Sequence, residues 1–388
     1  MSKYDFKTYR LKITVLTPLH IGNGREMLRG YDFAERGSEI WRFDENALLE
    51  TRDITDPKII EQLAQAKPAD LITDEREYKD GSPLFRYHIP GEARADQGRV
   101  REFIKDVYDH PYLPGTSLKG ALRTAIGWWE WGKKQKVTRE NDLYQPNGKK
   151  KRKEFAASEF ERDIFGRKPH KDLPGSDPNY DLMRALQISD SASLAPGVLQ
   201  VINVAVFRKA GNQPKINRIT SLEIVSPKVV FTVEIKLDTA LFSDWAREHG
   251  LDLKNGALIK EFAAHCKTYT RQRILTEKEY FHQNNFPETS SALKFYDQLS
   301  RLESQLSENS FWLQLGWGTG WDGKTFDSRL KESLSENYLK KAVETYDLGR
   351  GHTYSPIQKF PMSRRLPLVA QSDNLGKPLG WALVEIED

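Results

Sequence analysis

A run of four glycines between positions 316 and 323 is the feature that most constrains the fold of this chain. Residues 318–325 read Gly-Thr-Gly-Trp-Asp-Gly-Lys-Thr, which matches the spacing G-x-x-x-x-G-K-[ST] of a phosphate-binding loop. Glycine permits positive φ angles and close backbone approach, and successive free N–H groups in such a loop bind anions. The run therefore fits either an ATP or GTP site on a parallel sheet, or a loop that holds nucleic-acid phosphates.

The position of this run disfavours the nucleotide site. In phosphate-binding-loop proteins a later apolar strand ends in an acidic residue that assists Mg²⁺, and residues 326–388 contain no such strand end. Trp317 and Trp321 are also bulky for a loop that wraps a β-phosphate tightly. We therefore favour a loop that binds RNA phosphates. The binding residues predicted in it are Gly318, Gly320, Gly323 and Lys324.

A second glycine loop leads into a predicted helix at residues 112–126. Pro114 and Gly115 force a turn, and apolar residues then recur at helical spacing. A helix N-terminus favours phosphate through its free N–H groups and its dipole. The binding residues predicted here are Gly115, the candidate N-caps Thr116 and Ser117, Gly120, and the cations Lys119 and Arg123, which lie one turn apart.

The remaining candidates lie outside these two loops. His20 stands beside the turn that begins at Gly22, and an imidazole with a pKa near 6.5 can act as a general base in metal-independent RNA cleavage. No tyrosine or lysine partner can be assigned, so a structural or RNA-contacting role is favoured for His20. Arg218 belongs to a basic connection at 208–218. Arg364 and Arg365 lie on a proline-bounded segment, where they can supplement the phosphate contacts.

The composition is that of an ordinary globular protein. The 388 residues are 38% hydrophobic and 29% charged, and no apolar run approaches the roughly 20 residues that cross a bilayer. Cys266 is the one cysteine, which excludes an internal disulfide; with the polar N-terminal segment it predicts a cytoplasmic protein.

Scattered histidines disfavour a metal site, and no cofactor is expected. The net charge of +4 does not establish nucleic-acid binding, so the basic clusters at 133–136 and 149–153 are either solvated loops or phosphate contacts.

The order of predicted elements favours an α+β fold. Alternation and β-branched runs predict strands at 9–16, 182–189, 198–207, 219–225, 229–237, 311–315 and 380–386. Helical periodicity predicts helices at 57–66, 116–129, 153–164, 239–248, 256–283, 289–308 and 329–346. Single strands and pairs of strands alternate with helices, and this pattern occurs twice along the chain. It suits two α+β sandwiches better than one doubly wound sheet.

Taken in order, these segments resemble the RAMP superfamily (repeat-associated mysterious proteins) of CRISPR systems. The resemblance covers most of the chain, and Leu-Pro-Gly-Thr-Ser-Leu-Lys-Gly-Ala-Leu-Arg at 113–123 is its most specific part. The other matching segments are 16–24 (Leu-Thr-Pro-Leu-His-Ile-Gly-Asn-Gly), 163–166 (Asp-Ile-Phe-Gly), 186–190 (Leu-Gln-Ile-Ser-Asp) and the glycine run at 316–325.

The C-terminal part resembles the type III-A (Csm) subunit that caps the 3′ end of the crRNA. The glycine run, Phe360-Pro361, Arg364-Arg365 and Leu379-Gly380-Trp381 carry this likeness. The resemblance implies two ferredoxin-like (RRM-like) domains with insertions and glycine-rich loops. We expect the first at 1–226, with insertions near 26–110 and 133–180, and the second at 227–388 with a helical insertion.

The resemblance also implies a function. Such a subunit binds crRNA as a non-catalytic part of the effector complex, lies next to the backbone RAMP subunit, and supports crRNA maturation by host nucleases in antiviral defence. Backbone subunits cleave target RNA with an aspartate, and Asp32 has a similar neighbourhood, but we do not assign it that role. The hairpin arms at 198–225 can act as a thumb that wedges into the RNA. Two alternatives stay open: a metal-independent endoribonuclease that uses His20, and a scaffold whose loops contact neighbouring subunits.

Overall fold

The fold described here is that of a computed structural model. It describes residues 6–51, 61, 66–134, 148–152, 158–166, 178–251, 253, 255–325, 329, 336–348, 361–369, 372 and 374–387. The helix expected at 57–66 and much of the insertion expected at 133–180 lie outside these residues. Within them, no helix combines the length and the apolar character needed to cross a membrane.

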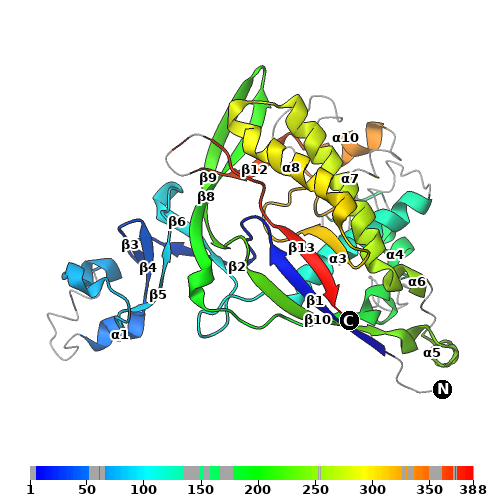
Figure 1. The fold of residues 1–388 in the computed structure, drawn as a ribbon, viewed down its shortest axis with the longest axis horizontal. Coiled ribbons are helices and arrows are strands. Elements are labelled where there is room, and N and C mark those ends of the chain that lie inside the picture. The colour runs from blue at the N-terminus through cyan, green and yellow to red at the C-terminus, as the bar shows by residue number, and fades with distance from the viewer. Residues whose placement is uncertain are drawn as a thin grey trace.

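Strands from both ends of the chain pair in a five-stranded antiparallel sheet, sheet A (Figure 1). Its order is β11-β13-β1-β10-β7, and β1 pairs along most of its length with β10 and β13. The alternation that predicted β1 arises because Leu11, Ile13 and Val15 face the core while the residues between them are less buried. The strands are β1 (Phe6–Val15), β7 (Leu186–Ile188), β10 (Val230–Asp238), β11 (Ser310–Gln314) and β13 (Trp381–Glu387).

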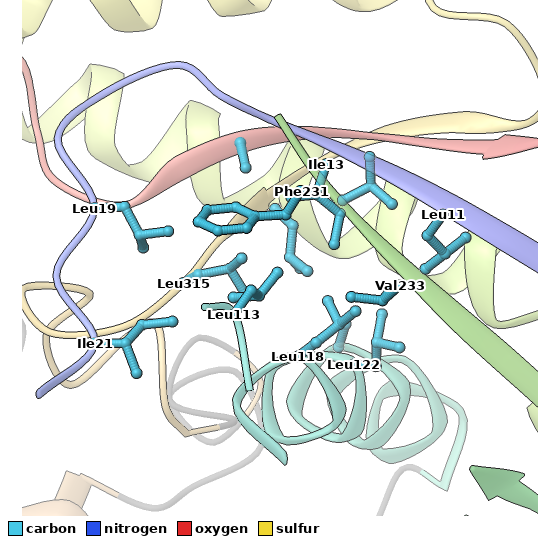
Figure 2. Packing of buried hydrophobic residues seen from close by; sticks show 14 of the residues in the cluster. Leu11, Ile13, Leu19, Ile21, Leu113, Leu118, Leu122, Phe231, Val233 and Leu315 are labelled. Atoms are coloured by element: carbon cyan, nitrogen blue, oxygen red, sulfur yellow. The ribbon is translucent and has the colours of Figure 1, made fainter. Parts of the chain in front are cut away.

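Helices cover sheet A and close its core. In Figure 2, Leu118 and Leu122 of α3 point toward Leu11 of β1 and toward Phe231 and Val233 of β10. The other long helices, α7 and α8, pack against each other (Figure 1). The helices of this part are α3 (Gly115–Lys134), α4 (Ser158–Phe165), α5 (Asp244–Glu248), α6 (Gly256–Lys260), α7 (Phe262–Gln283), α8 (Ser290–Leu302) and α10 (Glu336–Thr345).

A second five-stranded sheet, sheet B, has the order β12-β8-β9-β6-β2. Its centre is the antiparallel hairpin of β8 and β9, which confirms the two predicted arms. Strand β6 pairs in parallel with β9 and antiparallel with β2. The strands are β2 (Gly22–Leu28), β6 (Arg99–Phe103), β8 (Leu199–Ala210), β9 (Gln213–Val225) and β12 (Ser363–Pro367).

A small lobe at the left of Figure 1 contains a third sheet and one helix. Its strands are β3 (Phe33–Arg36), β4 (Glu39–Phe43) and β5 (Phe85–Pro90), and its helix is α1 (Glu45–Glu50). Phe43, Leu48 and Leu84 form its own apolar cluster. Short 3₁₀ turns connect elements throughout the chain, at 68–71, 75–77, 96–98, 178–180, 182–185, 196–198, 239–242, 287–289 and 303–305.

The α+β class is confirmed, and most predicted elements are present near their expected bounds. The strand expected at 182–189 is a 3₁₀ turn followed by the short strand β7. The proline-bounded segment with Arg364 and Arg365 is strand β12, which pairs with β8, about 160 positions earlier in the chain. The division at residue 226 stays a prediction, although both sheets contain strands from either side of it.

Candidate nucleic-acid interface

Three of the predicted loops meet in one open cleft with a cavity volume of about 670 Å³. The first wall is the turn from His20 into β2, the second is the first turns of α3, and the third is the glycine-rich loop after β11. The cleft is lined by residues 20–22 and 24–26, Arg101 and Glu102 of β6, Thr116, Ser117, Gly120, Ala121 and Thr124 of α3, and Gln314, Gly316, Trp317, Thr319, Gly323 and Lys324. The structure thus brings together segments almost 300 residues apart.

The three walls share one apolar core, which fixes their relative positions. Leu19 and Ile21 precede the first turn, Leu118 lies in α3, and Leu315 leads into the glycine-rich loop. Figure 2 shows these side chains converging on the same cluster beneath sheet A. Because well-packed interiors hold side chains in single positions, the cleft is formed before any ligand arrives.

The glycines of the third wall are required by close backbone approach. A Cβ on Gly316 (φ +74°) would lie 2.2 Å from the carbonyl oxygen of His20. The same carbonyl accepts the Trp317 N–H at 2.8 Å, which ties the loop to the first wall. A Cβ on Gly318 would meet Leu379 at 2.8 Å, and one on Gly323 would lie 2.6 Å from the Thr319 carbonyl oxygen.

A buried ionic network holds this loop from behind. Arg364 of β12 donates to Glu277 of α7 at 2.8 Å, and its guanidinium lies 3.5 Å from Asp322 of the loop. Arg273 of α7 lies 3.4 Å from Glu277 and 3.7 Å from Asp322. Burial opposes the charge of Arg364, but Glu277 and Asp322 raise its pKa above the ordinary value. Arg364 therefore forms ion pairs inside the protein, and these pairs position the loop.

The start of α3 is also held by hydrogen bonds within the protein. The Gly115 N–H donates to Asp190 Oδ1 at 2.7 Å, and the Leu113 N–H donates to Ser191 Oγ at 2.9 Å. A Cβ on Gly115 would lie 2.5 Å from the Ile188 carbonyl oxygen, so glycine permits this contact with the end of β7. Thr116, Ser117 and Gly120 face the cleft, whereas Gly115 supports it.

Lys119 and Arg123 do not line the cleft. Arg123 donates to Asp181 and Glu161, each at 3.0 Å, and its guanidinium lies 3.8 Å from the Phe165 ring centroid. Lys119 is half-buried beside this cluster; desolvation lowers its pKa, and Asp181 opposes that effect. Arg123 thus fixes α3 against the segments that follow it.

The positive charge of the cleft comes from Arg25, Arg101 and Lys324. Arg25 and Lys324 are exposed at its rim, and Arg101 lies 3.4 Å from Glu26. Such cations can neutralise phosphates, which supply most of the affinity in sequence-independent nucleic-acid binding.

Trp317 forms the apolar part of the third wall. The guanidinium groups of Arg365 and Arg101 lie 4.8 and 5.5 Å from its ring centroid, and His20 makes an edge contact at 6.3 Å. Cation–π contacts of this kind hold a guanidinium without neutralising it. The guanidinium of Arg365 thus lies near the cleft, over the ring of Trp317.

His20 is buried at the base of the cleft, with 1% of its surface exposed. Its Nδ1 lies 2.6 Å from the Glu223 carbonyl oxygen, so Nδ1 carries the hydrogen and donates. Desolvation lowers the pKa of His20 to about 4; the Glu223 bond opposes this, and Arg101 and Lys105 add to it. The ring is therefore neutral near pH 7, with the lone pair on Nε2.

The strand before the glycine-rich loop belongs to the wrong kind of sheet for an ATP or GTP site. A phosphate-binding loop follows a strand of a parallel sheet, whereas β11 is an edge strand of the antiparallel sheet A. The spacing at 318–325 is thus met without the fold in which it binds ATP or GTP.

The family model of the RAMP superfamily matches residues 12–321. The chain belongs to the RAMP superfamily. It is 28% identical over 179 residues to the CRISPR system Cms protein Csm5 of Streptococcus thermophilus, a match that covers 39% of this chain and 49% of that protein. This RAMP protein therefore matches about half the length of that curated relative.

Two solved structures resemble the whole chain. One is a chain of the cryo-EM structure of a Csm–crRNA–target RNA ternary complex of a type III-A CRISPR-Cas system, with a TM-score of 0.65 and 24% identity over 98% of this chain and 100% of that one. The other is the crystal structure of T. onnurineus Csm5, with a TM-score of 0.60 and 22% identity over 96% and 99% of the two chains. Both likenesses establish the fold, and the expected resemblance to Csm proteins is confirmed.

The structure gives the predicted site residues of this RAMP protein several different positions relative to the cleft. His20, Gly22, Thr116, Ser117, Gly120, Gly323 and Lys324 line the cleft. Gly318 and Gly320 belong to the glycine-rich loop, and Gly115, Arg123 and Arg364 support the walls. Lys119 lies beside Arg123, and Arg365 lies over the ring of Trp317. Arg218 is exposed on β9 and is not among the residues that line the cleft. The RNA contacts of all these residues remain proposals.

Sequence reasoning missed Arg101 because it treated 26–110 as an irregular insertion, and it did not consider Arg25, which lies just before that insertion. Strand β6 shows little regular periodicity, and it pairs with β2 and β9, far away in the chain. The signal in the sequence was weak, because Arg99, Val100 and Arg101 alternate but Glu102 breaks the pattern before Phe103.

Proposed function

We propose that this RAMP protein is a non-catalytic, crRNA-binding subunit of a type III-A CRISPR-Cas effector complex in the cytoplasm. The observation that carries the proposal is the cleft, where glycine loops, a helix start and the cations Arg25, Arg101 and Lys324 converge. A site built from backbone, hydroxyl groups and cations contacts phosphates and sugars without reading bases. That suits a protein that must accept any spacer sequence.

We propose a ferredoxin-like origin for sheet A. The elements β1, α3, β7, β10, α7 and β13 follow each other as in a βαββαβ unit, and β11 adds a fifth strand. The hairpin β8–β9 is inserted between β7 and β10. A second ferredoxin-like unit, with the boundary near residue 226, stays a prediction.

The resemblance to Csm5 supports a proposal for the position of the protein in the complex. We propose that the protein caps the crRNA 3′ end, that the backbone RAMP subunit is its neighbour, and that host nucleases trim the crRNA beside it. The hairpin β8–β9, whose tip is exposed and whose second strand carries the exposed Arg218, is the proposed thumb that reaches toward the RNA.

The rival ribonuclease function needs a general base with a pKa near the working pH. With a pKa of about 4, the imidazole of His20 is a poor base at neutral pH. This supports a binding role for His20. Purified protein incubated with repeat RNA in EDTA is expected to leave the RNA intact. Cleavage that stops on His20→Ala would establish the enzyme instead.

The test of the binding proposal is fluorescence anisotropy with single-stranded RNA across a salt series. We expect log K to fall by roughly 0.7 per tenfold rise in salt for each neutralised phosphate. Lys324→Ala should lower affinity and reduce that slope by about 0.7, because one contact is lost. Lys294→Ala on α8, an exposed lysine outside the cleft, is the matched control and should change neither. An affinity that does not depend on salt would reject the cleft as a phosphate site.

A further inference from the structure

His20 presents a neutral hydrogen-bond acceptor at the base of a cleft whose other lining residues include the cations Arg25, Arg101 and Lys324 and the carboxylates Glu26 and Glu102. Its Nδ1–H is fixed on the Glu223 carbonyl oxygen at 2.6 Å, which leaves Nε2 as the acceptor of a neutral imidazole. No described residue donates a hydrogen bond to Nε2. His20 has 1% of its surface exposed and lines the cleft, so Nε2 lies at the base of the site without a hydrogen-bond donor among the described residues.

Gly22 keeps the approach to this acceptor open. A Cβ at position 22 would lie 2.9 Å from Nε2 and 3.6 Å from Cε1, so any other residue would cover the ring nitrogen. Both His20 and Gly22 line the cleft. The backbone of His20 is held on the other side, since its carbonyl accepts the Trp317 N–H at 2.8 Å. The acceptor therefore points into the cleft from a fixed position.

An acceptor at this place does not suit a phosphate. Phosphate oxygens carry no hydrogen near neutral pH, so Nε2 and a phosphate would repel each other. The group that Nε2 fits is a donor, and the donor that every RNA nucleotide carries, and DNA lacks, is the ribose 2′-hydroxyl. Arg25 and Lys324 at the rim can meanwhile hold the flanking phosphates.

We propose that His20 Nε2 accepts a hydrogen bond from a ribose 2′-hydroxyl, and that this contact makes the cleft select RNA over DNA. The proposal rests on the proposed function and assigns its sugar specificity. His20 is the specificity-determining residue, and Gly22 is the positioning residue that leaves room for the sugar.

The test compares RNA with 2′-fluoro RNA of the same sequence on the full-length protein. The 2′-fluoro sugar keeps an RNA-like pucker and the phosphates but has no hydroxyl hydrogen to donate. We expect wild-type protein to bind RNA about 2- to 10-fold more tightly than 2′-fluoro RNA, because one hydrogen bond contributes a factor of that size. His20→Asn keeps a donor for the Glu223 carbonyl oxygen but removes the Nε2 acceptor, so the preference should fall by that factor.

Two glycine variants separate this contact from general damage to the fold. Gly22→Ala keeps the His20 ring but places a methyl group against Nε2, so it should lower the preference as His20→Asn does. Gly197→Ala, where a Cβ meets nothing within 4 Å, lies outside the cleft and should leave it unchanged. Because the readout is a ratio of two affinities on one protein sample, partial unfolding cancels.

The role of His20 and the proposed RNA binding would be overturned by different results. An unchanged RNA preference in His20→Asn, or equal binding of both ligands by wild-type protein, would overturn the assignment of His20 and leave RNA binding in place. Failure of wild-type protein to bind either ligand at low salt would overturn the proposed function, and this assignment with it.

Discussion

The substitution Gly316→Ala tests whether close backbone contact holds the glycine-rich loop on the first wall. Gly316 has φ +74°, and its added Cβ would lie 2.2 Å from the His20 carbonyl oxygen. Gly320 offers a matched control, since its φ is +72° but a Cβ there meets nothing within 4 Å. Both alanine variants carry the same left-handed backbone strain, and only Gly316→Ala adds the steric clash.

The magnitudes follow from these two contributions. Left-handed backbone costs a residue with a Cβ roughly 1–2 kcal/mol, which is the whole effect expected for Gly320→Ala. The clash should add about 1–3 kcal/mol, as overpacking does. It also displaces the carbonyl that accepts the Trp317 N–H at 2.8 Å. Gly316→Ala should therefore lower the free energy of unfolding by about 2–5 kcal/mol.

Urea unfolding followed by tryptophan fluorescence measures both variants. Trp317 lies in the affected loop, so its local environment and the global transition are both observed. Equal destabilisation by Gly316→Ala and Gly320→Ala would refute the reasoning, because the clash would then contribute nothing and the loop would not rest on His20.

Two further predictions concern buried charge. Glu277→Gln leaves the buried Arg364 without its main counter-charge and should lower the free energy of unfolding by about 3–5 kcal/mol in urea; Glu279→Gln, exposed on the same helix, should change it by less than about 0.5 kcal/mol. The pKa of His20 is about 4 in the folded protein and 6.5 in the unfolded chain. Its contribution to the free energy of unfolding is therefore complete above pH 6.5. Roughly 3 kcal/mol should be lost as pH falls from 6.5 to 4, and the loss should shrink in His20→Asn; identical pH profiles for the two proteins would contradict the assignment.

The sequence predicted the cleft walls well because each wall is marked by local chemistry. Glycines at 316–323 and the Pro-Gly turn at 114–115 report backbone requirements that any fold must satisfy nearby in the chain. The packing of β1 against α3 was also predictable in outline, since Leu11 and Leu118 lie in regular apolar patterns.

Roles that depend on distant partners were not predictable. Arg364 looked like an RNA-binding cation, but Glu277, which pairs with it, lies 87 positions earlier on another element. Arg123 likewise pairs with Asp181. A charged side chain in a sequence does not reveal whether it is paired inside the protein, so the charged residues of the cleft were only partly identified.

The central claim is that the cleft holds single-stranded RNA, and photo-crosslinking tests it most directly. A crRNA carrying 4-thiouridine in its 3′ part would be assembled into the full complex, irradiated, and the attached peptides identified by mass spectrometry. The account predicts crosslinks in the glycine-rich loop around Trp317 and Lys324, and in the first turns of α3 at 116–124. Crosslinks that avoid both segments, with this protein still present in the complex, would contradict it and favour a scaffold that contacts only neighbouring subunits.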